Sequence, residues 1–139
     1  MIEWDNGGRY LMKIVLFPER LPDEDTPIYE LLKSLERDHP REAALFKSIK
    51  NKLENSTDMT KFDQLRKLGY IERLKDELWE FRIPPKKKGG VLRIYFCFSK
   101  IERQKIVLLD GELKKRKRAN TTTAMKRLKA YREWEKTSR

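Results

Sequence analysis

The segment ELKKRKRAN, residues 112–120, contains five consecutive cations. Lysine and arginine side chains bind phosphate oxygens through charge-assisted hydrogen bonds. Three interpretations fit this composition: a solvated basic segment, a nuclear localisation signal, or part of a phosphate-binding site. A nuclear signal usually lies in a flexible terminus, whereas this run lies between a predicted strand and a predicted helix. We therefore expect phosphate binding by these cations, which are Lys114, Lys115, Arg116, Lys117 and Arg118.

The net charge of +11 is distributed unevenly along the 139 residues. Residues 1–83 contain 15 Lys and Arg against 17 Asp and Glu, which gives a net charge of −2. Residues 84–139 contain 18 Lys and Arg against 5 Asp and Glu, which gives +13. Such an asymmetric field attracts polyanions and accelerates their association. Nucleic acid is therefore the favoured partner, and a solvated basic surface without a partner is the alternative.

Length and composition limit the class of protein. The chain has the length of a single domain, here residues 1–139. No run reaches the roughly 18 apolar residues of a membrane helix, and the start MIEWDNGGRY lacks the pattern of a signal peptide. The single cysteine, Cys97, fits a reducing compartment. We expect a soluble cytoplasmic protein.

The first half of the chain predicts one strand followed by helices. Residues 8–19 are apolar on both faces of a strand, which is typical of an interior position in a sheet. Thr26 and Pro27 are typical of the first positions of a helix. The expected helical segments extend from there to residue 37, from about residue 41 to residue 53, and, as a short helix or turn, from residue 61 to residue 68.

Alternating apolar residues in the second half predict three antiparallel strands and a final helix. The strands are expected at residues 78–83, 91–99 and 106–110, and Asn120 or Thr121 is expected to cap the helix. The element order predicts an α+β domain. Its sheet would be twisted and antiparallel, built from the N-terminal strand and a three-strand meander. The N-terminal helices would lie on one face, against Trp79, Phe81, Ile83, Leu92, Ile94, Phe96 and Phe98.

Arg82, Arg93 and Tyr95 fall on the opposite face of these strands, which we expect to be open. Adjacent strands lie just under about 5 Å apart, so the three side chains can converge. The guanidiniums would bind phosphate oxygens and the phenol ring would stack on a base. In the alternative, Arg82 pairs with Glu80 or Glu77 and Arg93 is solvated at a sheet edge. Further RNA-binding cations are expected in the adjacent loop, at Lys86, Lys87 and Lys88.

Other catalytic motifs are not found in the sequence. His39, the single histidine, lies between two predicted helices and is expected at a helix end. One histidine and one cysteine cannot form a zinc site. Gly89-Gly90 lacks the strand–loop–helix context of a nucleotide-binding loop. We expect no metal, no nucleotide cofactor and no histidine-based triad.

The succession LKDELWEFRI, GGVLRIYF, IVLLDGELKKRKRAN and a basic helix resembles the RelE/HigB-like toxins of type II toxin–antitoxin modules, in particular their phage-derived HigB-type branch. The resemblance covers residues 70–134 and, more loosely, the helices from residue 26. It implies a twisted antiparallel sheet flanked by helices, and metal-independent cleavage of mRNA, usually on the ribosome. It also implies a neutralising antitoxin, often a helix-turn-helix protein of the HigA type. The implied catalytic residues are Arg82, Arg93, Lys114 and Lys115.

The resemblance implies a mechanism in which the RNA 2′-hydroxyl attacks the adjacent phosphate. Arg82 and Arg93 would hold the phosphorane oxygens, and Lys115 would add positive charge. Lys114 is one candidate for the base, because neighbouring cations penalise its protonation, and Glu112 is the other. Two other functions stay open. One is a ParE-like inhibitor of DNA gyrase, and the other is a non-catalytic nucleic-acid-binding protein.

Overall fold

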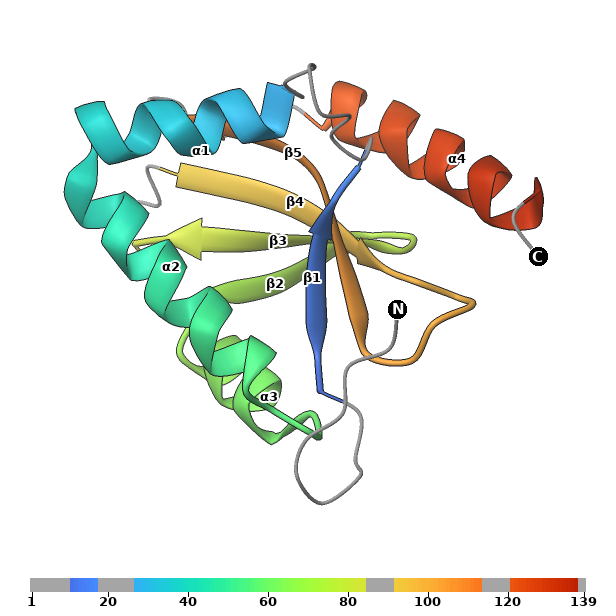
Figure 1. Cartoon of the computed structure of the whole chain (residues 1–139), viewed down its shortest axis with the longest axis horizontal. Helices are drawn as coiled ribbons and strands as arrows, with labels where there is room; N and C mark the ends of the chain where they lie inside the picture. The colour runs from blue at the N-terminus through green and yellow to red at the C-terminus, as the bar shows by residue number, and fades with distance from the viewer. Residues whose placement is uncertain (1–10, 18–26, 85–91, 114–120, 138–139) are drawn as a thin grey trace.

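The computed structural model describes residues 11–17, 27–84, 92–113 and 121–137. These residues form an α+β fold of four helices and one five-stranded sheet (Figure 1). In chain order the elements are β1 (Lys13–Leu16), α1 (Pro27–Asp38), α2 (Pro40–Glu54), α3 (Thr60–Lys67), β2 (Ile71–Lys75), β3 (Leu78–Ile83), β4 (Leu92–Phe98), β5 (Lys105–Leu113) and α4 (Thr122–Thr137).

The sheet is mixed, with strand order β1-β5-β4-β3-β2. Strands β2 to β5 form an antiparallel meander, whereas β1 pairs with β5 in parallel. The prediction of a wholly antiparallel sheet with a three-strand meander was therefore wrong in two respects. It missed β2, and it missed the direction of β1.

Strand β1 lies at an edge of the sheet, so its predicted interior position was also wrong. Both of its faces are nevertheless covered. Met12 and Ile14 belong to the core on one side of the sheet, and Val15 and Phe17 pack against the core on the other. Apolar residues on both faces of a strand indicate that other elements pack against both faces. They do not indicate whether the strand has one neighbouring strand or two.

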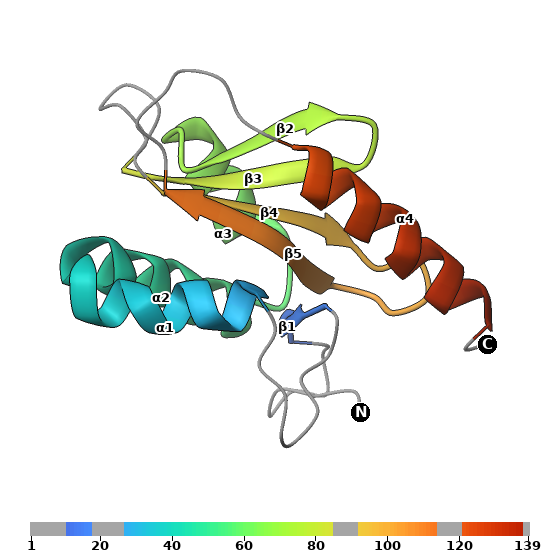
Figure 2. The ribbon, with the colours of Figure 1, turned by 90° about the horizontal axis from the view of Figure 1, so that it is seen from above.

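Each face of the sheet has its own core. The core under α1, α2 and α3 contains the predicted apolar face of β3 and β4, including Phe81, Ile94 and Phe96. The core under α4 includes Tyr95 and Leu128. Figure 2 shows α1 and α2 on one side of the sheet and α4 on the other. The face that was expected to be open is therefore partly covered by α4.

Proline and glycine residues mark several of the helix boundaries. Proline is compatible with the first turn of a helix because its missing N–H has no partner there. Both α1 and α2 begin at a proline, Pro27 and Pro40. The segment after α3 turns at Gly69, where a φ of 87° suits glycine.

Among the described residues, no helix is both long enough and apolar enough to cross a membrane.

A buried carboxylate attaches α4 to the turn between β4 and β5. Glu135 is only 3% exposed. It accepts hydrogen bonds from Ser99 Oγ (2.7 Å), from the Lys100 amide (3.1 Å) and from Arg132 Nη1 (2.8 Å). Burial alone would raise the pKa of Glu135, but these donors outweigh it and hold the pKa below its usual value. The anionic form therefore stabilises the attachment of α4.

We predict that this attachment weakens in acid. A carboxylate whose pKa is lowered by folding stabilises the fold above its unfolded pKa of 4.5, and this contribution is lost as the pH falls through the lower folded value. Wild-type protein should lose more unfolding free energy than Glu135→Gln between pH 7 and pH 3.5, measured by urea denaturation. Equal losses in the two proteins would contradict this role. Glu133→Gln, an exposed change on the same helix, is the control.

Candidate functional site

Arg82 and Arg93 lie directly opposite each other on β3 and β4. Glu80 and Tyr95 form the neighbouring cross-strand pair on the same face. Side chains at opposite positions of an antiparallel pair are within contact distance. The expectation that Arg82, Arg93 and Tyr95 share one face is therefore confirmed.

The guanidiniums are buried rather than open to solvent, which corrects the predicted exposed surface. Arg82 is 7% exposed and Arg93 is 8% exposed. Between them lies Glu80, whose exposed fraction is 0%. Arg82 Nε donates a short hydrogen bond to Glu80 Oε1, and Arg93 Nη1 lies 3.5 Å from the same oxygen. One carboxylate thus compensates two arginines.

A second carboxylate extends this network to β2. Arg82 Nη2 forms an ion pair of 2.8 Å with Glu72 Oε2. The alternative in which Arg82 pairs with a glutamate is confirmed for Glu80. It is wrong for Glu77, which instead pairs with Lys100 and Arg132. Glu72 was not predicted. A hairpin turn at Asp76 would have indicated it, because that turn places Glu72 opposite Glu80.

A third carboxylate, Glu112, lies on β5 opposite Arg93. Tyr95 donates its phenolic hydrogen to Glu112 Oε1 across 2.6 Å. Burial of Tyr95, together with this bond, raises the pKa of the phenol far above its usual value, so the phenol stays a hydrogen-bond donor. Tyr95 is also 0% exposed. Its predicted role as a stacking surface for a base is therefore wrong for this structure, and it positions Glu112 instead.

Helix α4 contributes an arginine that contacts β5 next to Tyr95. Arg127 Nη1 donates to the Leu109 carbonyl (2.7 Å) and lies 3.2 Å from Asp110 Oδ1. Asp110 is the β5 neighbour of Tyr95. Burial raises the pKa of the Asp110 carboxyl, and Arg127 opposes this change.

We refer to Glu72, Glu80, Arg82, Arg93, Tyr95 and Glu112 as the charged cluster.

The remaining predicted site residues lie outside the described part of the chain. They are Lys86, Lys87, Lys88, Lys114, Lys115, Arg116, Lys117 and Arg118. The strand ends that flank these two segments are nevertheless adjacent. Ile83 pairs with Leu92, and Leu92 pairs with Leu113. Residues 85–91 and 114–120, with eight lysines and arginines and no acidic residue, are thus joined to the same end of the sheet as the charged cluster.

This arrangement contains two kinds of group that are used in phosphodiester chemistry, guanidinium donors and a carboxylate. Arginine has five N–H donors, and in Arg82 the contacts with Glu80 and Glu72 involve Nε and Nη2. Glu112 is a carboxylate held in place by Tyr95, and a positioned carboxylate can accept a proton. Within residues 11–17, 27–84, 92–113 and 121–137, no group of His, Cys, Asp and Glu has the arrangement of a metal site.

The chain was compared with known proteins. No family model matches it, and no curated protein matches it.

We predict that Glu80 is essential for stability. Glu80→Gln removes the negative charge between two buried guanidiniums, and breaking a buried ion pair in this way costs about 3–5 kcal/mol of unfolding free energy. The matched control is Glu54→Gln, which removes a half-buried partner of Lys50 on α2 and should cost less than about 1 kcal/mol. Urea denaturation of both variants measures the difference. A cost for Glu80→Gln no larger than that of Glu54→Gln would show that the arginines do not depend on Glu80.

Proposed function

We propose that this protein is a type II toxin that cleaves mRNA without a metal ion. One observation supports the proposal most strongly. Arg82, Arg93 and Glu112, which come from three different strands, lie side by side across β3, β4 and β5. They do so at the sheet end to which both basic segments are joined. Phosphate-binding groups and a proton acceptor are therefore combined in one place.

In the proposed reaction the RNA supplies its own nucleophile. The 2′-oxygen forms a bond to the adjacent phosphorus while the bond from phosphorus to the 5′-oxygen breaks, which leaves a 2′,3′-cyclic phosphate and a 5′-hydroxyl. Glu112, oriented by Tyr95, accepts the proton of the 2′-hydroxyl. Arg82 and Arg93 stabilise the negative charge on the phosphorane oxygens. A lysine of residues 114–118 donates the proton that the leaving 5′-oxygen requires.

The carboxylates of the charged cluster impose a condition on substrate binding. Two guanidiniums in the charged cluster face three carboxylates, those of Glu72, Glu80 and Glu112. This cluster alone is not a strongly positive surface. The attraction for RNA must therefore come from the eight cations of residues 85–91 and 114–120. The cluster would act only after the phosphate has been brought close.

The proposal includes a location and a partner. Cleavage of mRNA, on or off the ribosome, requires the cytoplasm. A toxin also requires a neutralising protein, and we propose an antitoxin of the helix-turn-helix HigA type. An antitoxin that covers the end of the sheet beside Leu113 would prevent RNA from reaching Glu112.

We predict that Glu112→Gln slows RNA cleavage by about 10²–10⁴-fold, the usual contribution of a general base. Glutamine keeps the shape and can accept the Tyr95 hydrogen bond, so the fold should persist. The control is Glu133→Gln, an exposed change on α4. The assay maps cut sites in a defined message, with and without translating ribosomes. A Glu112→Gln protein that cleaves at the wild-type rate would remove Glu112 from the mechanism.

A test of Arg82 requires a substitution that disturbs the fold less than alanine does. Because it is buried between two carboxylates, Arg82→Ala would destabilise the fold as well as remove a phosphate contact. Arg82→Lys keeps the charge but loses the planar set of donors. A folded Arg82→Lys protein with slowed cleavage would support direct phosphate contact.

A second candidate function is non-catalytic binding of nucleic acid. The observation in its favour is that Arg82 and Arg93 are 7% and 8% exposed and already paired with Glu80. In that case the charged cluster only stabilises the sheet, and the basic segments bind the nucleic acid. Salt-sensitive binding without any cut, on or off the ribosome, would support this function over the first.

A further inference from the structure

Helix α2 presents a polar and basic face that is separate from the charged cluster. Phe46, Ile49 and Leu53 of α2 belong to the core under the helices. The opposite side of the helix is exposed. It carries Ala44, Lys47, Ser48, Asn51, Lys52 and Asn55, which recur at helical spacing.

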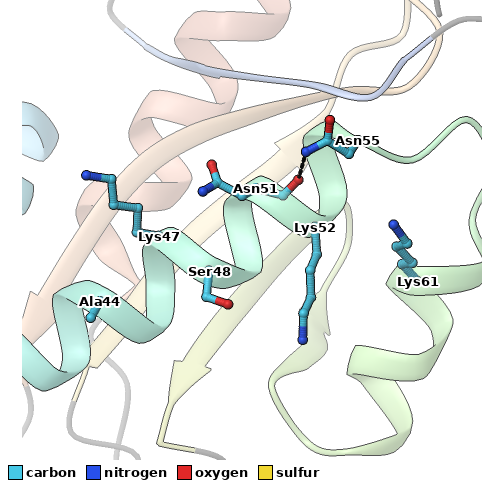
Figure 3. Close-up of a pocket in the computed structure, with 7 residues that line it drawn as sticks. All are labelled: Ala44, Lys47, Ser48, Asn51, Lys52, Asn55 and Lys61. Atoms are coloured by element: carbon cyan, nitrogen blue, oxygen red, sulfur yellow. Dashed lines mark hydrogen bonds between the residues drawn. The ribbon is translucent and has the colours of Figure 1, made fainter.

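This face and Lys61 of α3 line an open hollow of about 510 Å³, which we call the lysine shelf. Figure 3 shows Lys52 on α2 and Lys61 on α3 on either side of the space between the two helices, with Lys47 nearer to the N-terminal end of α2. Asn55 Nδ2 donates to the Asn51 carbonyl (2.8 Å) and fixes the end of α2. None of the described residues that line the shelf is acidic.

Glu54, the last residue of α2, is paired with a lysine outside the shelf. Glu54 forms an ion pair of 2.8 Å with Lys50, which does not line the shelf. Three lysines therefore contribute positive charge beside neutral hydrogen-bonding groups. From Lys47 to Lys52 the helix rises about 7.5 Å, at about 1.5 Å per residue. Figure 3 shows Lys47 and Lys52 extending from α2 in different directions, so their ammonium groups are spread apart rather than gathered around one small anion.

These properties fit a nucleic-acid backbone better than they fit an acidic peptide. Lysine, serine and asparagine side chains are typical donors to phosphate and sugar oxygens in protein–nucleic acid complexes. An exposed ammonium binds phosphate as a point charge and needs no fixed geometry. Ser48, Asn51 and Asn55 can also donate hydrogen bonds to the sugar oxygens of a nucleic acid, which an acidic peptide lacks.

We propose that the lysine shelf binds phosphate groups of an RNA backbone, as a contact distinct from the charged cluster. The shelf belongs to the helices that cover one face of the sheet, whereas Arg82 and Arg93 lie on the face toward α4. The two contacts therefore bind different segments of RNA. The inference shares the RNA partner of the proposed function but does not depend on cleavage.

The test measures binding to RNA that cannot be cleaved. The probe is a 20-nucleotide 2′-O-methyl RNA of mixed sequence, which lacks the attacking hydroxyl. The shelf variant changes Lys47, Lys52 and Lys61 to glutamine. The control variant changes three exposed lysines that do not line the shelf, Lys33, Lys75 and Lys136, and so has the same net charge. Circular dichroism and urea denaturation establish that both variants are folded.

We expect the shelf variant to bind the probe at least about tenfold more weakly than wild type at 0.1 M salt. The slope of log affinity against log salt should fall by about 2, because each lost single-strand phosphate contact contributes about 0.7. The control variant should stay within about threefold of wild type. Restoring the charge with Lys47→Arg, Lys52→Arg and Lys61→Arg should restore binding.

Three outcomes would overturn the proposal. In the first, the shelf variant binds the probe as wild type does. In the second, the shelf and control variants lose equal affinity, so that only net charge matters. In the third, the shelf variant loses affinity for polyglutamate but not for the probe, which would assign the shelf to an acidic protein. The cleavage assay on the same variants is a separate readout, so a protein without nuclease activity can still satisfy or fail this test.

Discussion

A single buried carboxylate holds two arginines together across β3 and β4. Arg82 and Arg93 are directly opposite each other in the sheet, and like charges in that position repel. Glu80 contacts both of them and has an exposed fraction of 0%. Without Glu80 the two guanidiniums would be buried without that compensation, so the geometry of the charged cluster depends on this residue.

In the proposed function, the same constraint separates the groups that attract RNA from the groups that act on its phosphate. The carboxylates of the charged cluster offset the positive charge of Arg82 and Arg93, so long-range attraction falls to residues 85–91, residues 114–120 and the lysine shelf. Tyr95 donates a hydrogen bond to Glu112, which gives this carboxylate a defined orientation. In the proposed reaction, a phosphate brought to this point would meet donors already held in place by these carboxylates.

The sequence was informative wherever a local rule decides the structure. The period-two pattern of residues 78–83 and 92–98 placed Arg82, Arg93 and Tyr95 on one face correctly, and Pro27 placed the start of α1. The sequence did not indicate which faces of the sheet are covered by helices. The pattern that put Tyr95 on the second face could not show that α4 partly covers that face. The strand order, with β1 parallel at an edge, is also set by tertiary packing rather than by residue periodicity.

The most direct measurement is hydrogen exchange at the Arg82 Nε–H, followed by NMR. Arg37 is the internal reference, because its Nε also bonds a carboxylate, that of Asp38, but its side chain is 76% exposed. If Glu80 holds Arg82 inside the folded sheet, the Arg82 Nε–H should exchange much more slowly than that of Arg37, and Glu80→Gln should abolish the difference. Equal exchange rates in the wild-type protein would contradict a buried, carboxylate-centred cluster.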